Sequence, residues 1–201
     1  MNKFGGWNVN VPHDKFPQKV ASAISNLDNL VGCSYKAVAY LGTQEVNGTN
    51  HAVLAQQTVM TGKDANNAVV IVFNEKRGVM DLAVTDIKRI VESGGELGGT
   101  NVNMSTTLPE EASEAFKAAF FGIMGFRMEP IAYVGSKVEN GTRHIIIAEY
   151  EAMTLKGNTE IVIVSINTNT KKVNVERVFE LGSNDVDDDE IFSYAFNWLK
   201  K

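Results

Sequence analysis

Histidine and cysteine are the side chains of this chain whose chemistry could support catalysis. The 201 residues include three histidines and one cysteine, Cys33. A histidine can act as a general base near neutral pH, and a cysteine becomes a nucleophile when a base lies beside it. His51 and His144 are candidate bases, but the sequence around Cys33 supplies neither a base nor an orienting group. We therefore expect an inert thiol and a protein that is not an enzyme.

An acidic run near the end of the chain partly matches the ligand spacing of a calcium-binding loop. Asp185, Asp187 and Asp189 alternate as the first ligands of such a loop do. A calcium loop also needs glycine at its sixth position and a bidentate glutamate at its twelfth. Glu190 and Phe196 stand there instead. The sequence therefore predicts no metal site, and no other cofactor.

Composition and charge are those of a globular chain without a nucleic-acid partner. Apolar residues make up 44% and charged residues 21%, close to the average for soluble domains. Residues 1–93 carry a net charge of +1, and residues 94–201 a net charge of −6. Nucleic-acid binding requires a basic patch that releases counterions from phosphates. The acidic second part of the chain argues against that function.

Hydropathy and cysteine content predict the compartment. The longest apolar runs, such as Ala68–Phe73, fall far below the roughly 20 residues that span a bilayer. No secretory signal is visible at the start, and a single cysteine excludes an internal disulfide. We expect a cytoplasmic protein with no membrane partner, or a secreted one if a signal was removed.

An internal repeat organises the sequence. Shifting the chain by 93 residues aligns Gly5–Asn74 with residues 98–167, with 19 identities in 70 gapless positions, where about four are expected by chance. Asn47-Gly48-Thr49 and His51 are among the residues shared by the two repeats. The histidines are therefore explained equally well as repeated scaffold residues. The period predicts two units, 1–93 and 94–186, followed by a C-terminal helix at 187–201.

Each repeat has the pattern of one amphipathic helix followed by antiparallel hairpins. Pro17 and Gly32 bracket the first helix, and Pro109 and Gly125 the second. Asn-Gly between strand-like runs indicates a type I′ hairpin turn, which needs two residues at positive φ. The predicted fold class is α+β, with one helix packed across an antiparallel sheet in each unit. The strand-like runs are Lys36–Gly42, His51–Gln57, Ala68–Phe73 and Val79–Val84, then Pro130–Gly135, Arg143–Ala152, Glu160–Asn167 and Lys172–Phe179.

The predicted C-terminal helix rests on its own pattern. Acidic residues suit the positive end of a helix, and Lys200-Lys201 suit its negative end. Its apolar face comprises Ile191, Tyr194, Ala195 and Trp198. We expect this helix to dock on the rest of the chain.

The first repeat resembles a cystatin, and most of all the stefin type. Gly5-Gly6 precedes the helix, and Gln44-Glu45-Val46-Asn47-Gly48 matches the Q-x-V-x-G motif of that family. The resemblance covers about residues 4–85 and, through the repeat, about residues 97–180. Stefins are intracellular and lack disulfides, in agreement with the single cysteine.

This resemblance implies reversible inhibition of papain-like cysteine proteases. Cystatins occlude the active-site cleft with a wedge made of an N-terminal segment and two hairpin loops, without covalent chemistry. A glycine in the N-terminal segment allows close approach of backbone to the enzyme. The protease-binding residues implied for this chain are Gly5, Gly6, Gln44, Glu45, Val46, Asn47 and Gly48, with Glu75, Lys76 and Arg77 in the second loop.

The second repeat departs from the motif. Lys137 replaces the glutamine and Glu139 the valine, and burying a charged side chain at an apolar contact costs desolvation energy. The second loop of the first repeat also lacks the Pro-Trp pair of many cystatins. The alternative function is therefore a non-inhibitory binding or assembly module, in which Asn-Gly serves hairpin formation alone.

Overall fold

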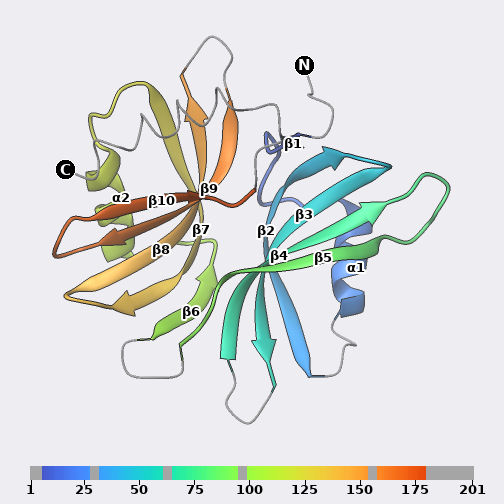
Figure 1. Cartoon of the computed structure of the whole chain (residues 1–201), viewed down its shortest axis with the longest axis horizontal. Helices are drawn as coiled ribbons and strands as arrows, with labels where there is room; N and C mark the ends of the chain where they lie inside the picture. The colour runs from blue at the N-terminus through green and yellow to red at the C-terminus, as the bar shows by residue number, and fades with distance from the viewer. Residues whose placement is uncertain (1–5, 28–31, 61–64, 95–98, 154–157, 180–201) are drawn as a thin grey trace. The chain divides into compact units, whose positions relative to one another are not determined.

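A computed structural model describes residues 6–27, 32–60, 65–94, 99–153 and 158–179. By spatial contacts the chain divides into two compact units, Met1–Thr106 and Thr107–Lys201; the sequence period alone predicts a boundary at residues 93/94. Two antiparallel five-stranded sheets dominate the structure, as Figure 1 shows.

The first sheet has the strand order β1-β2-β3-β4-β5, so each strand pairs with its neighbours along the chain. Helix α1 (Gln18–Leu27) lies between β1 and β2 in sequence. The strands are β1 (Trp7–Asn8), β2 (Cys33–Glu45), β3 (Thr49–Val59), β4 (Ala65–Glu75) and β5 (Ala83–Val91).

The second sheet has the order β10-β9-β8-β7-β6, the same arrangement for the second repeat. Helix α2 (Glu110–Phe120) separates β6 from β7. Strands β2 and β7 carry bulges at equivalent places, Tyr40/Gly42 and Tyr133/Gly135 among them. The strands are β6 (Thr100–Ser105), β7 (Phe126–Val138), β8 (Thr142–Ala152), β9 (Thr159–Asn167) and β10 (Val173–Arg177).

The predicted α+β fold class is wrong, because the described residues are mostly β-sheet. The two helices have ten and eleven residues, whereas β2 and β7 each have 13. Residues Ala52–Ala55 of β3 are all fully buried, so both faces of that strand are removed from solvent. A strand buried on both faces loses the alternation that reveals its length in sequence, whereas an amphipathic helix stays visible. The sequence therefore reveals the helices more clearly than the strands, and the predicted fold class overstates the contribution of the helices.

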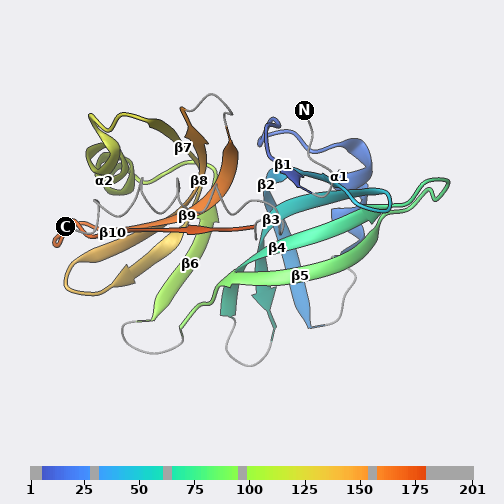
Figure 2. The same cartoon turned by 45° about the horizontal axis from the view of Figure 1, so that its top comes forward.

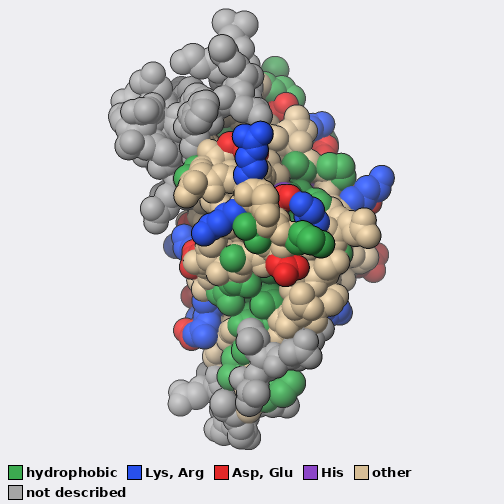
Figure 3. Space-filling view, turned by 90° about the vertical axis from the view of Figure 1, so that its right-hand side faces the viewer, with side chains coloured by type: hydrophobic (Ala, Val, Ile, Leu, Met, Phe, Trp, Pro, Cys, Tyr) green, Lys and Arg blue, Asp and Glu red, His purple; other side chains and the backbone are tan. Residues whose placement is uncertain are grey.

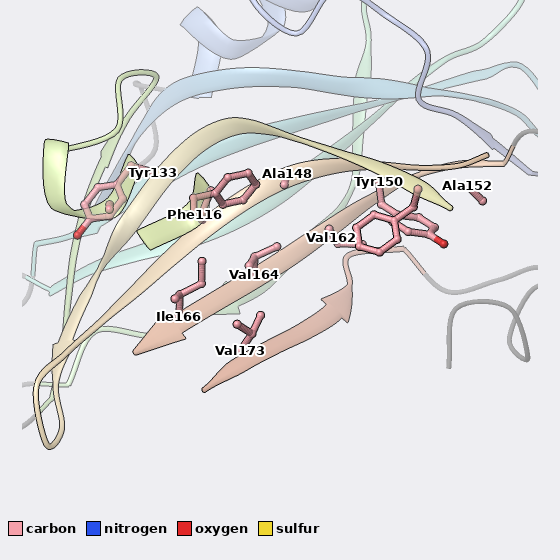
Figure 4. Close-up of a cluster of buried hydrophobic side chains, with 12 residues drawn as sticks. Phe116, Tyr133, Ala148, Tyr150, Ala152, Val162, Val164, Ile166 and Val173 are labelled. Atoms are coloured by element: carbon pink, nitrogen blue, oxygen red, sulfur yellow. The ribbon is translucent and has the colours of Figure 1, made fainter. Parts of the chain in front are cut away.

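Each helix contributes two buried side chains to a core made mainly by strands. In α1 these are Val20 and Leu27, and in α2 Ala112 and Phe116. Full burial of Val20, Leu27 or Phe116 stabilises the fold by about 1.5–3 kcal/mol each. Figure 4 shows Phe116 among strand residues of the second core. Strand residues of the first core are Tyr35, Tyr40, Val53, Ala55, Val69, Ile71 and Phe73.

Strand β5 differs from the strand predicted at Val79–Val84. Most of that segment belongs to the connection between β4 and β5, and the strand runs over Ala83–Val91 instead. Val79 and Met80 are exposed, so their apolar character alone predicted the strand at the wrong residues. The predicted helix at 187–201 lies outside the described residues. No helix of the described residues is long and apolar enough to cross a membrane.

Candidate protein-binding rims

Strand register brings three separate segments of the first repeat to one end of the first sheet. Trp7 at the start of β1 pairs with Gln44 near the end of β2. Glu45 pairs with Thr49 across the first hairpin, and Thr49 pairs with Glu75 at the end of β4. We call this end the first rim, formed by Gly6–Trp7, Gln44–Gly48 and Glu75–Gly78. Gly5, the remaining predicted site residue, lies outside the described residues.

The first hairpin of the rim has the positive φ angles that its Asn-Gly sequence predicts, but three residues, Val46–Gly48, connect the paired residues Glu45 and Thr49 instead of a two-residue type I′ turn. Asn47 and Gly48 have φ angles of 48° and 111°, both in the region that favours asparagine and glycine. The Val46 N–H donates to the Gly48 carbonyl at 3.0 Å. A Cβ on Gly48 would lie 2.4 Å from the Glu75 carbonyl oxygen. The two loops of the rim are thus in direct backbone contact.

A chain of polar contacts supports the rim on the α1 side of the sheet. The Tyr40 hydroxyl lies 2.7 Å from His51 Nδ1, and His51 Nε2 lies 3.3 Å from Glu75 Oε2. Lys19 of α1 forms an ion pair with the same Glu75 carboxylate. All of these contacts are satisfied when Tyr40 donates to Nδ1 and the Nε2 proton of His51 faces Glu75. Glu75, predicted as a protease contact, therefore has a positioning role within the rim.

Burial and neighbouring charges shift the pKa values of Tyr40 and Glu75 in this chain of contacts. Burial, with a smaller contribution from the Glu75 carboxylate, raises the pKa of Tyr40 to about 12. The hydrogen bond from Lys19, followed by that from His51, lowers the pKa of Glu75 below its ordinary value. Near neutral pH the tyrosine is a neutral donor and the glutamate is charged. This arrangement keeps the end of β4 attached to α1.

A second row of side chains supports the rim on the opposite face of the sheet. The Asn50 amide donates to Gln44 Oε1 at 2.9 Å, and the Asn74 amide donates to Asn50 Oδ1 at 2.7 Å. Asn74 is buried. Three strands are therefore linked side chain to side chain directly beneath the loops. Gln44, predicted as a contact residue, has its side-chain oxygen engaged in this row.

The exposed part of the rim is apolar and basic. Val46 at the hairpin tip is 46% exposed, and Lys76 and Arg77 are exposed in the second loop. Val79 and Met80, which the sequence does not predict as contact residues, are 50% and 89% exposed in the same connection. The signal for them was the polar segment Lys76–Gly78, which separates these two apolar residues from the end of β4.

The connection between β4 and β5 projects beyond the strands in Figure 1 and Figure 2. Figure 3 views that side of the molecule, where apolar side chains are interspersed with basic and acidic ones. A mixed surface of this kind is suited to contact with another protein.

The equivalent end of the second sheet, which we call the second rim, is formed by Lys137–Gly141 and Thr168–Lys171 and is closed by its own side chains. Asn167 donates from Nδ2 to the Glu139 carbonyl at 2.7 Å, and its Oδ1 accepts from the backbone N–H groups of Asn169 and Thr170. Asn169 also covers the turn, because a Cβ on Gly141 would lie 2.6 Å from its Cγ. The connection between β9 and β10 therefore folds back on the hairpin instead of extending from it.

The second rim also differs in charge. Glu139, which replaces the motif valine, lies 3.2 Å from Arg143 and 4.0 Å from Lys137. Beneath it, Tyr133 contacts His144 Nδ1 at 3.1 Å, but the buried His144 Nε2 has no hydrogen-bond partner. The nearest carboxylate, on Glu111 of α2, is 3.7 Å away. The second rim thus keeps the tyrosine–histidine pair but lacks the bond that would connect it to a loop.

The candidate catalytic side chains, Cys33, His51 and His144, all lie beside tyrosine hydroxyls. Cys33 is partly buried and donates towards the Tyr35 hydroxyl at 3.4 Å. His51 and His144 are buried, and each contacts a tyrosine hydroxyl. No group of three or more His, Cys, Asp and Glu side chains within residues 6–27, 32–60, 65–94, 99–153 and 158–179 is arranged to hold a metal.

Comparisons of this chain with protein-family models, with curated proteins and with solved structures find no match.

Proposed function

We propose that the first rim is the binding surface of a reversible proteinaceous inhibitor of papain-like cysteine proteases. The observation that carries this proposal is the alignment of Gly6–Trp7, Gln44–Gly48 and Glu75–Gly78 at one end of the first sheet. These segments are the ones that the resemblance to cystatins implies, and they are far apart in sequence. Inhibition by steric occlusion needs such a composite edge and no reactive group.

Preorganisation supports the same proposal. Side-chain contacts hold the rim on both faces of the sheet, through Tyr40–His51–Glu75 on one and Gln44–Asn50–Asn74 on the other. A rigid surface loses little conformational entropy on binding, so more of the contact energy contributes to affinity. The exposed Val46 supplies an apolar contact at the tip, which becomes buried in a narrow cleft.

Enzyme inhibition by the full-length chain tests this proposal. A panel of papain-like proteases is assayed with a fluorogenic peptide, and we expect stoichiometric inhibition that reverses on dilution. Val46→Asp should weaken inhibition at least about tenfold, because a carboxylate would have to be desolvated in the cleft. Val138→Asp is the matched control, since Val138 is also exposed at a hairpin of the second rim, and it should leave inhibition unchanged.

Two results would reject the proposal. One is the absence of inhibition across the panel at micromolar protein. The other is inhibition that Val46→Asp and Val138→Asp weaken equally, since this would place the contact elsewhere.

The second rim favours the alternative of a non-inhibitory binding or assembly module for the second repeat. Its loop is folded back by Asn167 and Asn169, and Glu139 is paired with Arg143. If the whole chain is such a module, Val46→Asp leaves partner binding intact and no protease is inhibited. The same panel therefore separates the two functions.

A further inference from the structure

Strand β5 is the outer edge of the first sheet, and its exposure is unusual for this chain. The sheet order places β4 on one side of β5, and no described strand pairs with its other side. Seven of its nine residues are exposed, from Ala83 to Arg89. Figure 2 shows β5 as the outermost strand of that sheet. An open edge presents unpaired backbone N–H and C=O groups to any other strand.

Two bulges limit the regular part of this edge to four residues. The register of β5 on β4 shifts between Val84 and Asp86 and again between Arg89 and Val91. Between the bulges, Asp86–Arg89 pair one for one with β4. Bulges restrict which strands can be added to an edge, because they bend the strand and interrupt its ladder. Any strand that pairs here must therefore match this short segment.

The charges of this segment are complementary when two copies of it pair antiparallel. When two identical strands pair antiparallel about a two-fold axis perpendicular to the sheet, each side chain stays on its own face of the sheet. Opposed residues must then lie an even number of positions apart, so the axis passes beside a residue and not between two residues. Centring on Asp86, Lys88 or Arg89 would oppose that charge to its own copy, which is destabilising. Centring on Ile87 places Asp86 opposite Lys88 on both sides of the axis.

The side chains concerned are available for this pairing. Neither Asp86 nor Lys88 has an ion-pair partner among the described residues, whereas Arg89 is already paired with Glu92. Ile87 is 36% exposed and Val84 41% exposed, so apolar side chains are available on the face opposite the charged pair. Cross-strand opposite-charge and apolar pairs both stabilise a sheet.

We propose that two copies of this chain dimerise through β5, antiparallel and centred on Ile87, so that two first sheets form one continuous sheet. The dimer is isologous: Asp86 of each chain pairs with Lys88 of the other, and Ile87 contacts Ile87 of the second chain. This surface is separate from the first rim, so it does not depend on the proposed protease inhibition.

Sedimentation velocity of the full-length chain tests the dimer over about 1 µM to about 1 mM, a range that includes weak and transient interfaces. We expect a reversible monomer–dimer equilibrium within it. Asp86→Lys alone and Lys88→Asp alone should each weaken dimerisation roughly tenfold, because each creates like-charge pairs across the axis. An equimolar mixture of the two variants should recover dimers, since every charge then faces its opposite.

The rescue by mixing distinguishes pairing from misfolding, because a variant that fails to fold would not recover. Lys117→Glu on α2 is the control for a change of net charge away from β5, and it should leave the equilibrium unchanged. A chain that stays monomeric throughout the range overturns the proposal. So does a dimer that both β5 variants leave intact, because its interface would lie elsewhere.

Discussion

The two rims share a turn but differ in what lies next to it. Asn47-Gly48 and Asn140-Gly141 have nearly the same φ angles. In the first rim the neighbour of the turn glycine is the backbone of Glu75, and in the second it is the side chain of Asn169. Both repeats therefore share the conformation of this hairpin, and the neighbouring loop determines which surface each rim exposes.

The same contrast extends beneath the turns. The tyrosine–histidine pair occurs in both repeats, but only in the first does a histidine nitrogen contact a loop carboxylate at hydrogen-bond distance, namely His51 with Glu75. Thr168 occupies the position of Glu75 in the second repeat. Ala112 likewise occupies the position of Lys19, so both partners of the ion pair that holds the first rim to its helix are absent from the second repeat.

The largest expected difference concerns the turn glycines. Gly48→Ala should destabilise the first hairpin by about 2–4 kcal/mol, since the new Cβ adds positive-φ strain and meets a backbone oxygen. Gly141→Ala should cost about 1–2 kcal/mol, because the Asn169 side chain can rotate away. Hydrogen exchange of β2–β3 and β7–β8 measures each locally. Equal losses would show that the two turns have equivalent surroundings.

The tyrosine hydroxyls should give the next largest effect. Tyr40→Phe leaves buried His51 without its partner at Nδ1, which should cost about 1–2 kcal/mol. Tyr133→Phe removes a longer contact to a histidine that already has one unpaired nitrogen, so we expect about half that loss. Urea unfolding of each variant provides the comparison. A larger loss for Tyr133→Phe would contradict the view that the first rim is the better supported.

Acid should weaken the first rim through Glu75. Its pKa is held below the ordinary value of 4.5 by Lys19 first and then by His51. The stability that this carboxylate contributes is therefore fully present above that ordinary value and is lost as pH falls through the lowered pKa of the folded chain. Glu75→Gln should remove this part of the pH dependence in urea unfolding. Glu139→Gln in the second rim controls for the loss of one rim carboxylate.

The smallest expected effect is that of a motif graft. Lys137→Gln with Glu139→Val recreates Q-x-V-x-G in the second repeat, yet we expect no gain of protease inhibition, because Asn167 still folds the neighbouring loop back. The assay uses the graft in a Val46→Asp background, so that inhibition by the first rim does not mask the result. Inhibition by this combined variant would show that the motif alone is sufficient.

Local signals predicted the turns well and the strands less well. Asn-Gly indicated positive φ at both hairpins because few other residues adopt that conformation. The segment Val79–Val84 was predicted as a strand, because hydrophobicity alone does not distinguish an exposed loop from a strand. The fold class failed for a related reason: β3 is buried on both faces and shows no alternation over Ala52–Ala55.

The candidate site was predicted residue by residue but not as a surface. The resemblance named Gln44 and Glu75 as contacts, whereas the structure engages their side chains in contacts beneath the loops. Met80 was missed, although it is among the most exposed apolar side chains described. These roles depend on which strand lies beside which, and cross-strand contacts are not encoded in local spacing.

The sequence by itself determined the 93-residue repeat, the two Asn-Gly turns and the difference in charge between the repeats. Each of these depends on residue identity or on the conformation of a few adjacent residues. Only the tertiary structure decided that Gln44–Gly48 and Glu75–Gly78 share one rim, and that β5 is an open edge. The physical reason is register: antiparallel pairing places Thr49 opposite Glu75, 26 positions away in the sequence, and a shift of one residue would turn each side chain to the other face.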